Sequence, residues 1–302
     1  MPEDTQQTVE TAGPSFNLRV ESRANLTESG FKGARLSFAL GGDINDRFSY
    51  YVFQNLHKPI TSSDLMAATD QAYLRYRMKD NLWFRAGKFP INYGSWEYDA
   101  APIDIYYYTR MFLEAHFFQP GLEAVYILPT GKDAIELQAC RSLDAKDNEF
   151  DLFTFSASWR GNFGFFKPLY SFNVSQLSAH AGLRYDIALG NQFIYGPYKV
   201  ELDLMNRYYS NRGTRFMESF AACLKAVYGF RPWMDFFVKA NYDNEPLLYN
   251  ESRVFAGCEY FPVKGSRNVR IHAMAGARMG DEPGFAGTIG VKWNVVLFNA
   301  KK

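Results

Sequence analysis

Short segments in which apolar and polar side chains alternate recur along the whole chain, and this pattern constrains the fold more than any other feature. Between residues 233 and 241, for example, Phe236 and Val238 alternate with Asp235 and Lys239. Successive side chains on a β-strand point to opposite faces of the sheet. Each segment therefore predicts a strand that has one apolar face and one polar face.

We count 16 such segments, and only residues 104–116 offer a competing turn or two of amphipathic helix. The segments that start near Phe150 and Phe163 are the weakest, because both of their faces carry apolar or aromatic side chains. The 16 predicted strands start near Ser15, Phe31, Arg47, Thr69, Asn81, Gly121, Asp133, Phe150, Phe163, Ser178, Tyr198, Arg215, Trp233, Arg253, Asn268 and Gly284.

The connections between these segments alternate in length. Tight clusters of Gly, Asn, Asp and Pro, such as residues 42–46 and 129–133, follow most even-numbered segments and suit hairpin turns. Longer linkers, such as residues 57–66 and 90–120, follow several odd-numbered segments. This arrangement is typical of an up-and-down meander with turns at one rim and loops at the other.

Alternation fits either a soluble β-protein with an apolar interior or a membrane barrel with an apolar exterior. Arginines stand beside bulky aromatics at the polar positions, which suits a crowded lumen. Trp83 and Trp233 follow tight turns and Trp159 precedes one, as the aromatic girdles of membrane barrels require. A closed barrel also pairs every backbone group in lipid. We therefore predict an all-β, transmembrane, antiparallel up-and-down β-barrel of about 16 strands.

Composition excludes several other classes. The mean hydropathy is −0.29, and no stretch of about 18 apolar residues suits a membrane helix. With 33 Lys and Arg against 32 Asp and Glu, the net charge of +1 offers no surface for nucleic acid. The spacing of Cys140, Cys223 and Cys258 matches no metal or redox motif, so we expect neither metal nor cofactor.

The domain organisation follows from the same segments. Residues 1–14 lack a basic start followed by an apolar run, so we expect a flexible N-terminal segment without a signal peptide. Residues 15–302 form one barrel domain, with a long loop at residues 91–118 that folds inward. His180 and His272 lie on predicted strands without a serine motif, so we do not expect an enzyme.

The longest loop opens with Arg-Ala-Gly-Lys-Phe-Pro-Ile-Asn-Tyr-Gly at residues 85–94. This stretch resembles the porin O and P family, the phosphate-selective porins of Gram-negative outer membranes, whose members carry Gly-Lys-Phe where a strand leaves for an inward loop. The matching residues here are Gly87, Lys88, Phe89, Gly94 and Glu97, and residues 121–124 resemble the return into the next strand. The resemblance implies a 16-stranded outer-membrane barrel, often a trimer, with Lys88 in the pore.

Charge patterning gives the candidate pore residues. The predicted inward arginines of the first five strands form one basic wall, and the long loop carries four acids and one arginine, unlike the family's basic pores. We expect the loop to narrow the lumen opposite cations, or to be tied to the wall by ion pairs. The candidate pore-lining residues are Arg19, Arg23, Arg35, Arg75, Arg77, Arg85 and Lys88, and the candidate constriction residues are Glu97, Asp99, Asp104, Arg110 and Glu114.

Residues 105–108 and 117–118 of this loop are aromatic or apolar, and they suit either stacking of sugars or the loop's own core. We expect an outer-membrane porin-like channel for passive diffusion of small solutes or ions, with weak charge selectivity. Its expected partners are outer-membrane lipid, the solutes and further copies in a homotrimer. The alternative is a plugged barrel that serves as a subunit of a larger outer-membrane assembly.

Overall fold

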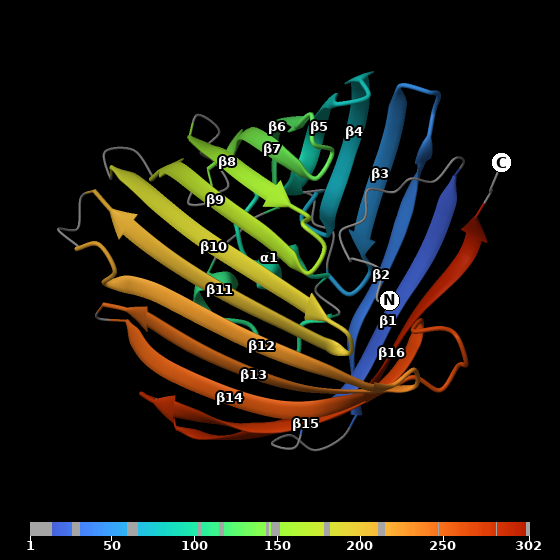
Figure 1. The fold of residues 1–302 in the computed structure, drawn as a ribbon, viewed down its shortest axis with the longest axis vertical. Helices are drawn as coiled ribbons and strands as arrows, with labels where there is room; N and C mark the ends of the chain where they lie inside the picture. The colour runs from blue at the N-terminus through green and yellow to red at the C-terminus, as the bar shows by residue number, and fades with distance from the viewer. Residues whose placement is uncertain are drawn as a thin grey trace.

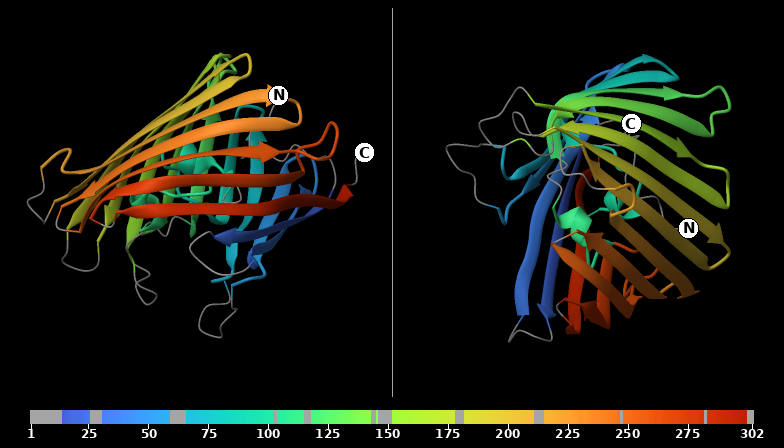
Figure 2. Two further views of the ribbon diagram at one scale, coloured as in Figure 1. Left: turned by 90° about the horizontal axis from the view of Figure 1, so that it is seen from below. Right: turned by 90° about the vertical axis from the view of Figure 1, so that its left-hand side faces the viewer.

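The computed structural model describes residues 14–25, 31–58, 66–101, 104–114, 118–142, 145, 152–177, 182–210, 215–246, 248–281 and 283–299, with the side chains of residues 23–25, 31–34 and 299 left out. Of the predicted N-terminal segment, only Pro14 lies within this part. Sixteen strands form a closed antiparallel barrel in which each strand pairs with its neighbours in sequence and β1 pairs with β16. The ring of strands is visible in Figure 1, and Figure 2 shows it from two further directions.

The strands are β1 (Ser15–Asn25), β2 (Phe31–Asp43), β3 (Phe48–Asn55), β4 (Thr69–Lys79), β5 (Leu82–Pro90), β6 (Phe118–Ile127), β7 (Asp133–Arg141), β8 (Phe153–Gly161), β9 (Phe166–Gln176), β10 (Leu183–Tyr195), β11 (Tyr198–Tyr209), β12 (Ser219–Arg231), β13 (Met234–Glu245), β14 (Tyr249–Tyr260), β15 (Val269–Gly280) and β16 (Gly284–Asn299). Two short helices, α1 (Trp96–Asp99) and α2 (Arg110–Leu113), lie between β5 and β6. In the described part of the chain, no helix is long and apolar enough to cross a membrane.

The structure confirms the predicted barrel, and all 16 predicted strands are present. The predicted starts differ from the observed ones by up to five residues, the largest difference being at β10, which begins at Leu183. Strand β6 begins at Phe118, three residues before the predicted Gly121, because Phe118 pairs with Pro90 of β5. The inward loop therefore ends before residue 118.

Exposure separates the two faces of each strand as the alternation predicts. On β13, Phe236 and Val238 are 42% and 48% exposed, whereas Phe237 and Lys239 are 6% and 8% exposed. The apolar side chains thus cover the outside of the barrel, where a membrane barrel meets lipid. The inward side chains are shielded by the wall itself and by the loop that enters the barrel.

The two segments with the weakest alternation form regular strands, β8 and β9. On β8, Phe153 and Phe155 are exposed on the outside, and the inward positions Thr154, Ser156 and Ser158 are buried. Small hydroxyl side chains fill this inward face. They leave room for the loop to lie against the wall at β8 and β9.

Candidate functional site

The connection between β5 and β6 is called here the inner loop (residues 91–117), and its described residues, 91–101 and 104–114, lie inside the barrel. Figure 1 shows α1 inside the ring of strands, next to β10 and β11. Ile91, Tyr93, Tyr98 and Phe112 of the loop are buried together in one apolar cluster. The described part of the loop is therefore a packed element with its own core, held inside the lumen.

Two glycines allow the backbone to approach a neighbouring strand closely, Gly87 where the loop leaves β5 and Gly94 where the loop meets the far wall. Gly87 has a φ of +133°, and a Cβ there would lie 2.3 Å from the carbonyl oxygen of Ala72. A Cβ on Gly94 would lie 2.4 Å from the backbone nitrogen of Ser171 on β9. Only glycine fits at these two positions, which explains the glycine of Gly-Lys-Phe and the later glycine.

Asp203 of β11 holds the first turn of α1. Its carboxylate accepts hydrogen bonds from the backbone nitrogens of Trp96 and Glu97 at 2.8 and 2.9 Å, and from the hydroxyl of Ser95 at 2.8 Å. The first N–H groups of a helix lack partners within the helix and favour a negative group. A carboxylate of the wall thus replaces water at the helix terminus and fixes α1 against β11.

Ion pairs tie the charged side chains of the inner loop to the half of the wall formed by β8 to β15. Glu97 pairs with Lys239 of β13, and Asp104 pairs with Arg270 of β15. The remaining pairs, with their N–O distances, are Asp99 with Arg160 of β8 (2.6 Å), Glu114 with Arg207 of β11 (3.1 Å) and Arg110 with Glu251 of β14 (3.0 Å). All five predicted constriction residues are therefore engaged with the wall.

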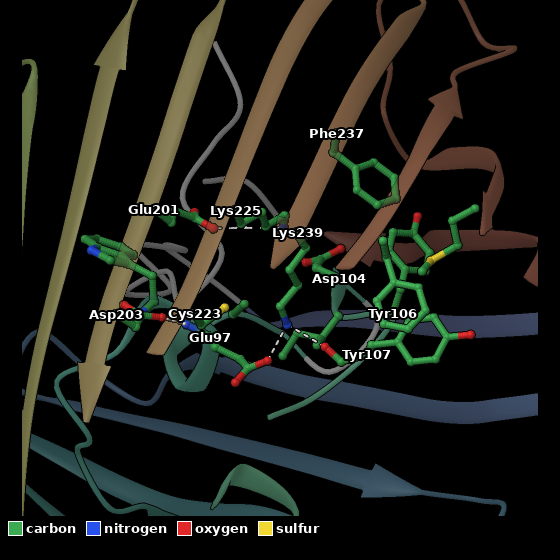
Figure 3. A pocket seen from close by; sticks show the side chains of 15 residues that line it. Glu97, Asp104, Tyr106, Tyr107, Glu201, Asp203, Cys223, Lys225, Phe237 and Lys239 are labelled. Atoms are coloured by element: carbon green, nitrogen blue, oxygen red, sulfur yellow. Dashed lines mark hydrogen bonds and ion pairs between the residues drawn. The ribbon is translucent and has the colours of Figure 1, made fainter. Parts of the chain in front are cut away.

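Figure 3 shows the contact between the loop and the wall around Lys239. The ammonium group of Lys239 donates to the carboxylate of Glu97 and to the backbone carbonyl of Tyr107. Burial alone would raise the pKa of the Asp104 carboxyl nearby, but the guanidinium of Arg270 holds this pKa below its ordinary value. The acids of the loop are thus neutralised by the wall rather than left facing the lumen.

The aromatic residues of the inner loop stack on rings of the wall. The ring of Tyr106 is parallel to that of Phe237 at 5.2 Å, and the ring of Tyr107 is parallel to that of Phe255 at 3.8 Å. These rings attach the loop to β13 and β14. The expected roles were sugar stacking and packing of the loop, and the structure shows packing, with rings of the wall as partners. Phe117 lies outside the described residues.

The opposite half of the barrel carries the predicted basic wall. We define the arginine wall as Arg19, Arg35, Arg75, Arg77 and Arg85, on the inward faces of β1, β2, β4 and β5. Arg85 pairs with Glu123 at 2.7 Å. Among the described residues, the other four have no carboxylate within ion-pair distance.

Aromatic rings, rather than carboxylates, support two of these four arginines, Arg19 and Arg75. The guanidinium of Arg75 lies 4.5 Å from the ring centroid of Trp83, and that of Arg19 lies 5.3 Å from the ring of Phe53. A ring orients a guanidinium through its π-face without cancelling its charge. The arginine wall therefore remains electropositive, whereas the wall behind the loop is compensated.

Two expectations about single residues are corrected by the geometry. Trp83 was expected at a membrane interface but lies on the inward face, directly opposite Arg77 on β4. Lys88 was expected in the pore but lies on the outward face of β5, opposite Ala72, and donates to the carbonyl of Met66 at 2.8 Å. Successive side chains on a strand point to opposite faces, so the position of each residue in β5 decides whether its side chain points inward or outward. The side chain of Arg23, on β1, lies outside the described residues.

Sequence reasoning missed the wall residues that hold the loop. Lys239, Arg207 and Arg270 lie at inward positions of their strands, but their pairing with the loop was not foreseen. The role of Asp203 at the helix terminus was not foreseen either. Arg160 was not expected inward at all. Alternation identifies the face of such a residue, but its partner depends on how the closed ring surrounds the loop.

The comparisons with known proteins agree with this architecture. OmpT of Vibrio cholerae, expressed in the outer membrane, has a similar structure, with a TM-score of 0.67 and 10% identity over 93% of this chain and 97% of that one. Its trimer form, folded in vitro, gives a TM-score of 0.66 and 12% identity over 95% and 100%. A triple mutant of the Rhodopseudomonas blastica porin gives 0.58 and 9% identity over 94% and 99%. These likenesses concern the fold.

No curated protein sequence matches the chain. The model of the family described as phosphate-selective porin O and P matches residues 13–164, which are 152 of the 302 residues. This half contains β1 to β5, the inner loop, and the two glycines at which the loop leaves β5 and meets the wall. The chain therefore belongs to the phosphate-selective porin O and P family and is an outer-membrane channel protein of the Gram-negative type.

Proposed function

We propose that this porin is a passive diffusion channel for small solutes and ions with a weak preference for anions. The observation that carries the proposal is the unequal charge of the two sides of the lumen. The acids of the inner loop are paired with β8 to β15, and four arginines on β1, β2 and β4 have no carboxylate partner in the described part of the chain. The net field of the open passage is therefore positive.

The preference is weak for two physical reasons. Salt at physiological strength screens charges beyond a Debye length of about 8 Å, so ions that cross far from the arginine wall feel little of it. The arginines without a carboxylate partner are also spread over β1, β2 and β4 rather than gathered around one oxyanion. A positive wall raises the local concentration of anions, but selective binding needs donors arranged around one ligand.

Reversal potentials in planar bilayers under a KCl gradient test the proposal. We expect the wild-type channel to favour chloride modestly, and the double variant Arg75→Ala with Arg77→Ala to shift the reversal potential toward cations. Lys132→Ala is the matched control, because Lys132 is an exposed cation in the β6–β7 turn. A cation-selective wild type, or an equal shift in the control, would contradict the role of the arginine wall.

The plugged barrel is a second candidate, and the packing of the inner loop favours it. The buried loop cluster of Tyr93, Tyr98, Met111 and Phe112 extends to Tyr73, which lies on the same strand as Arg75. If this packing closes the passage, the barrel serves a larger outer-membrane assembly. Single-channel recording separates the two candidates, because a plugged barrel shows no steady openings whereas a porin shows them without added partners.

We also propose that the protein assembles as a homotrimer in outer-membrane lipid. The support comes from the fold, which this chain shares over almost its full length with a protein solved in a trimer form. Mass photometry of the detergent-purified protein checks this, with a trimer mass as the expected result. A monomeric mass at all protein concentrations would contradict it.

A further inference from the structure

A groove of about 310 Å³ is present on the outside of the barrel, across β9, β10 and β11. Figure 1 shows these three strands side by side. Ile187 and its cross-strand neighbour Asn206 both line the groove. Its other lining residues are Phe172, Tyr185, Tyr208 and Phe216. These side chains alternate with inward residues such as Asp186 and Arg207, so the groove opens on the lipid face.

The groove lies near the loop rim of the barrel. The β10–β11 connection is a two-residue turn, Gly196 and Pro197, so the β11–β12 connection that carries Phe216 belongs to the opposite rim, which is extracellular in such barrels. Asn206 is three residues from the end of β11 at Tyr209, about 10 Å along the strand. The groove therefore faces the upper part of the outer leaflet.

A constrained turn holds Phe216 at this groove. The backbone nitrogen of Arg215 donates to the carboxylate of Glu218 at 2.7 Å, and Met217 between them has a φ of +68°. A non-glycine residue rarely adopts this left-handed conformation, because its side chain crowds the backbone. Phe216 and Met217 are 66% and 50% exposed. The turn thus presents apolar side chains outward at the rim, although the left-handed conformation of Met217 costs free energy.

Asn206 gives the groove a polar point. Its side-chain nitrogen donates to the carbonyl of Ser219 at 3.0 Å, but among the described residues no donor reaches its Oδ1. Asn191 on the same face of β10 differs, because its Oδ1 accepts from the hydroxyl of Tyr170 at 2.8 Å. An amide oxygen in lipid without a donor is unfavourable. The occupant of the groove should therefore supply one.

We propose that this groove binds an acyl chain of an outer-leaflet lipid, one that carries a hydroxyl or amide hydrogen-bond donor close to its headgroup. The groove is continuous with the lipid-facing surface of the barrel, so lipid is the molecule that meets it. The aromatic rings pack against the chain, and the donor reaches Oδ1 of Asn206. The site is separate from the lumen and does not depend on the proposed ion preference.

Native mass spectrometry of lipid retained by the whole protein tests the proposal. The probe is a mixed micelle with equal amounts of two phosphatidylethanolamines that differ only in a myristoyl or a β-hydroxymyristoyl chain. We expect wild type to retain the hydroxylated lipid by about three- to tenfold over the other, the effect of one hydrogen bond. Asn206→Leu should abolish this preference and still retain lipid, while Asn191→Leu, the matched control, should keep the preference.

Two further variants test the groove itself. Ile187→Trp fills it, and Phe216→Ala removes one of its aromatic sides, so both should lower total lipid retention while single-channel conductance stays at the wild-type level. Equal retention of the two lipids by wild type overturns the proposal, as does a preference that survives Asn206→Leu. Lipid retention that is the same in wild type and in both groove variants would also overturn the proposal. So would cross-links between copies of the protein from a photoreactive residue introduced in place of Phe216.

Discussion

The guanidinium of Arg75 lies over the indole ring of Trp83, with its central carbon 4.5 Å from the ring centroid. Arg75 is also directly opposite Arg85 on the neighbouring strand, and like charges at such positions destabilise a sheet. Glu123 compensates Arg85, whereas Arg75 has the ring and, among the described residues, no carboxylate partner. The indole therefore keeps a positive charge ordered on the wall without neutralising it.

Replacement of Trp83 by Leu removes the ring that supports Arg75 but leaves the charge of Arg75 in place. We expect Trp83→Leu to lower the free energy of unfolding by about 1–2 kcal/mol, the range of a desolvated cation–π contact. The sign of the ion preference should not change, because Arg75 keeps its charge. Urea titrations of folding in lipid vesicles and reversal potentials measure the two effects. Trp233→Leu, at an exposed ring, should cost less.

The faces of the strands could be predicted from the sequence because side-chain alternation is a local property. Val238 and Lys239 lie on opposite faces as expected, and so do Ile271 and His272, which are 40% and 1% exposed. The closed barrel follows from repeating such a strand 16 times with short turns between even and odd strands. No long-range information is needed for this part of the fold.

The partners of the inner loop could not be predicted in the same way. Glu97 and Lys239 are 142 residues apart, and their meeting depends on which part of the ring the loop approaches. The loop acids were expected to face the lumen or to be tied to the wall. The ion pairs with β8 to β15 are of the second kind, so the wall compensates the charge of the loop acids.

The pairing of Lys239 makes this inward residue sensitive to substitution. Lys239→Ala leaves the buried carboxylate of Glu97 without its cation, so we expect a loss of about 3–5 kcal/mol in the free energy of unfolding. The double variant Lys239→Met with Glu97→Gln removes both charges and should recover much of this loss. Folding titrations in vesicles measure both. A loss that is the same in the single and the double variant would show that the pair is not coupled.

The outward neighbour of Lys239 gives a test of the lipid face. Val238 is 48% exposed on the outside of β13. Val238→Arg should lower the free energy of unfolding in vesicles by about 2–4 kcal/mol if this position is near the bilayer midplane. Val238→Leu is the apolar control and should be nearly neutral. An arginine tolerated without cost would contradict the assignment of this face to lipid.

Gly94 controls how closely the inner loop approaches the wall. A Cβ at this position would lie 2.4 Å from the nitrogen of Ser171 and 2.5 Å from the carbonyl oxygen of Ala188. Gly94→Ala should therefore push the loop away from β9 and β10 into the passage and reduce single-channel conductance. Gly284→Ala is the control, because its Cβ would meet nothing closer than 3.8 Å. Unchanged conductance in Gly94→Ala would mean that the loop does not border the passage.

The pairing of Asp104 with Arg270 predicts a pH dependence of the loop's attachment. Burial raises the pKa of Asp104, but Arg270 and its hydrogen bond outweigh burial and lower the pKa below the ordinary 3.8. A carboxyl with a lowered pKa stabilises the folded state fully above its unfolded pKa, and this stability is lost as the pH falls through the lower, folded-state value. We therefore expect wild type to be more stable than Asp104→Asn at pH 7 and the difference to shrink only below about pH 4. Urea titrations of both proteins across this range measure it. A difference that already disappears between pH 7 and pH 5 would contradict the ion pair, because an aspartate that loses its effect there has a raised pKa rather than a lowered one.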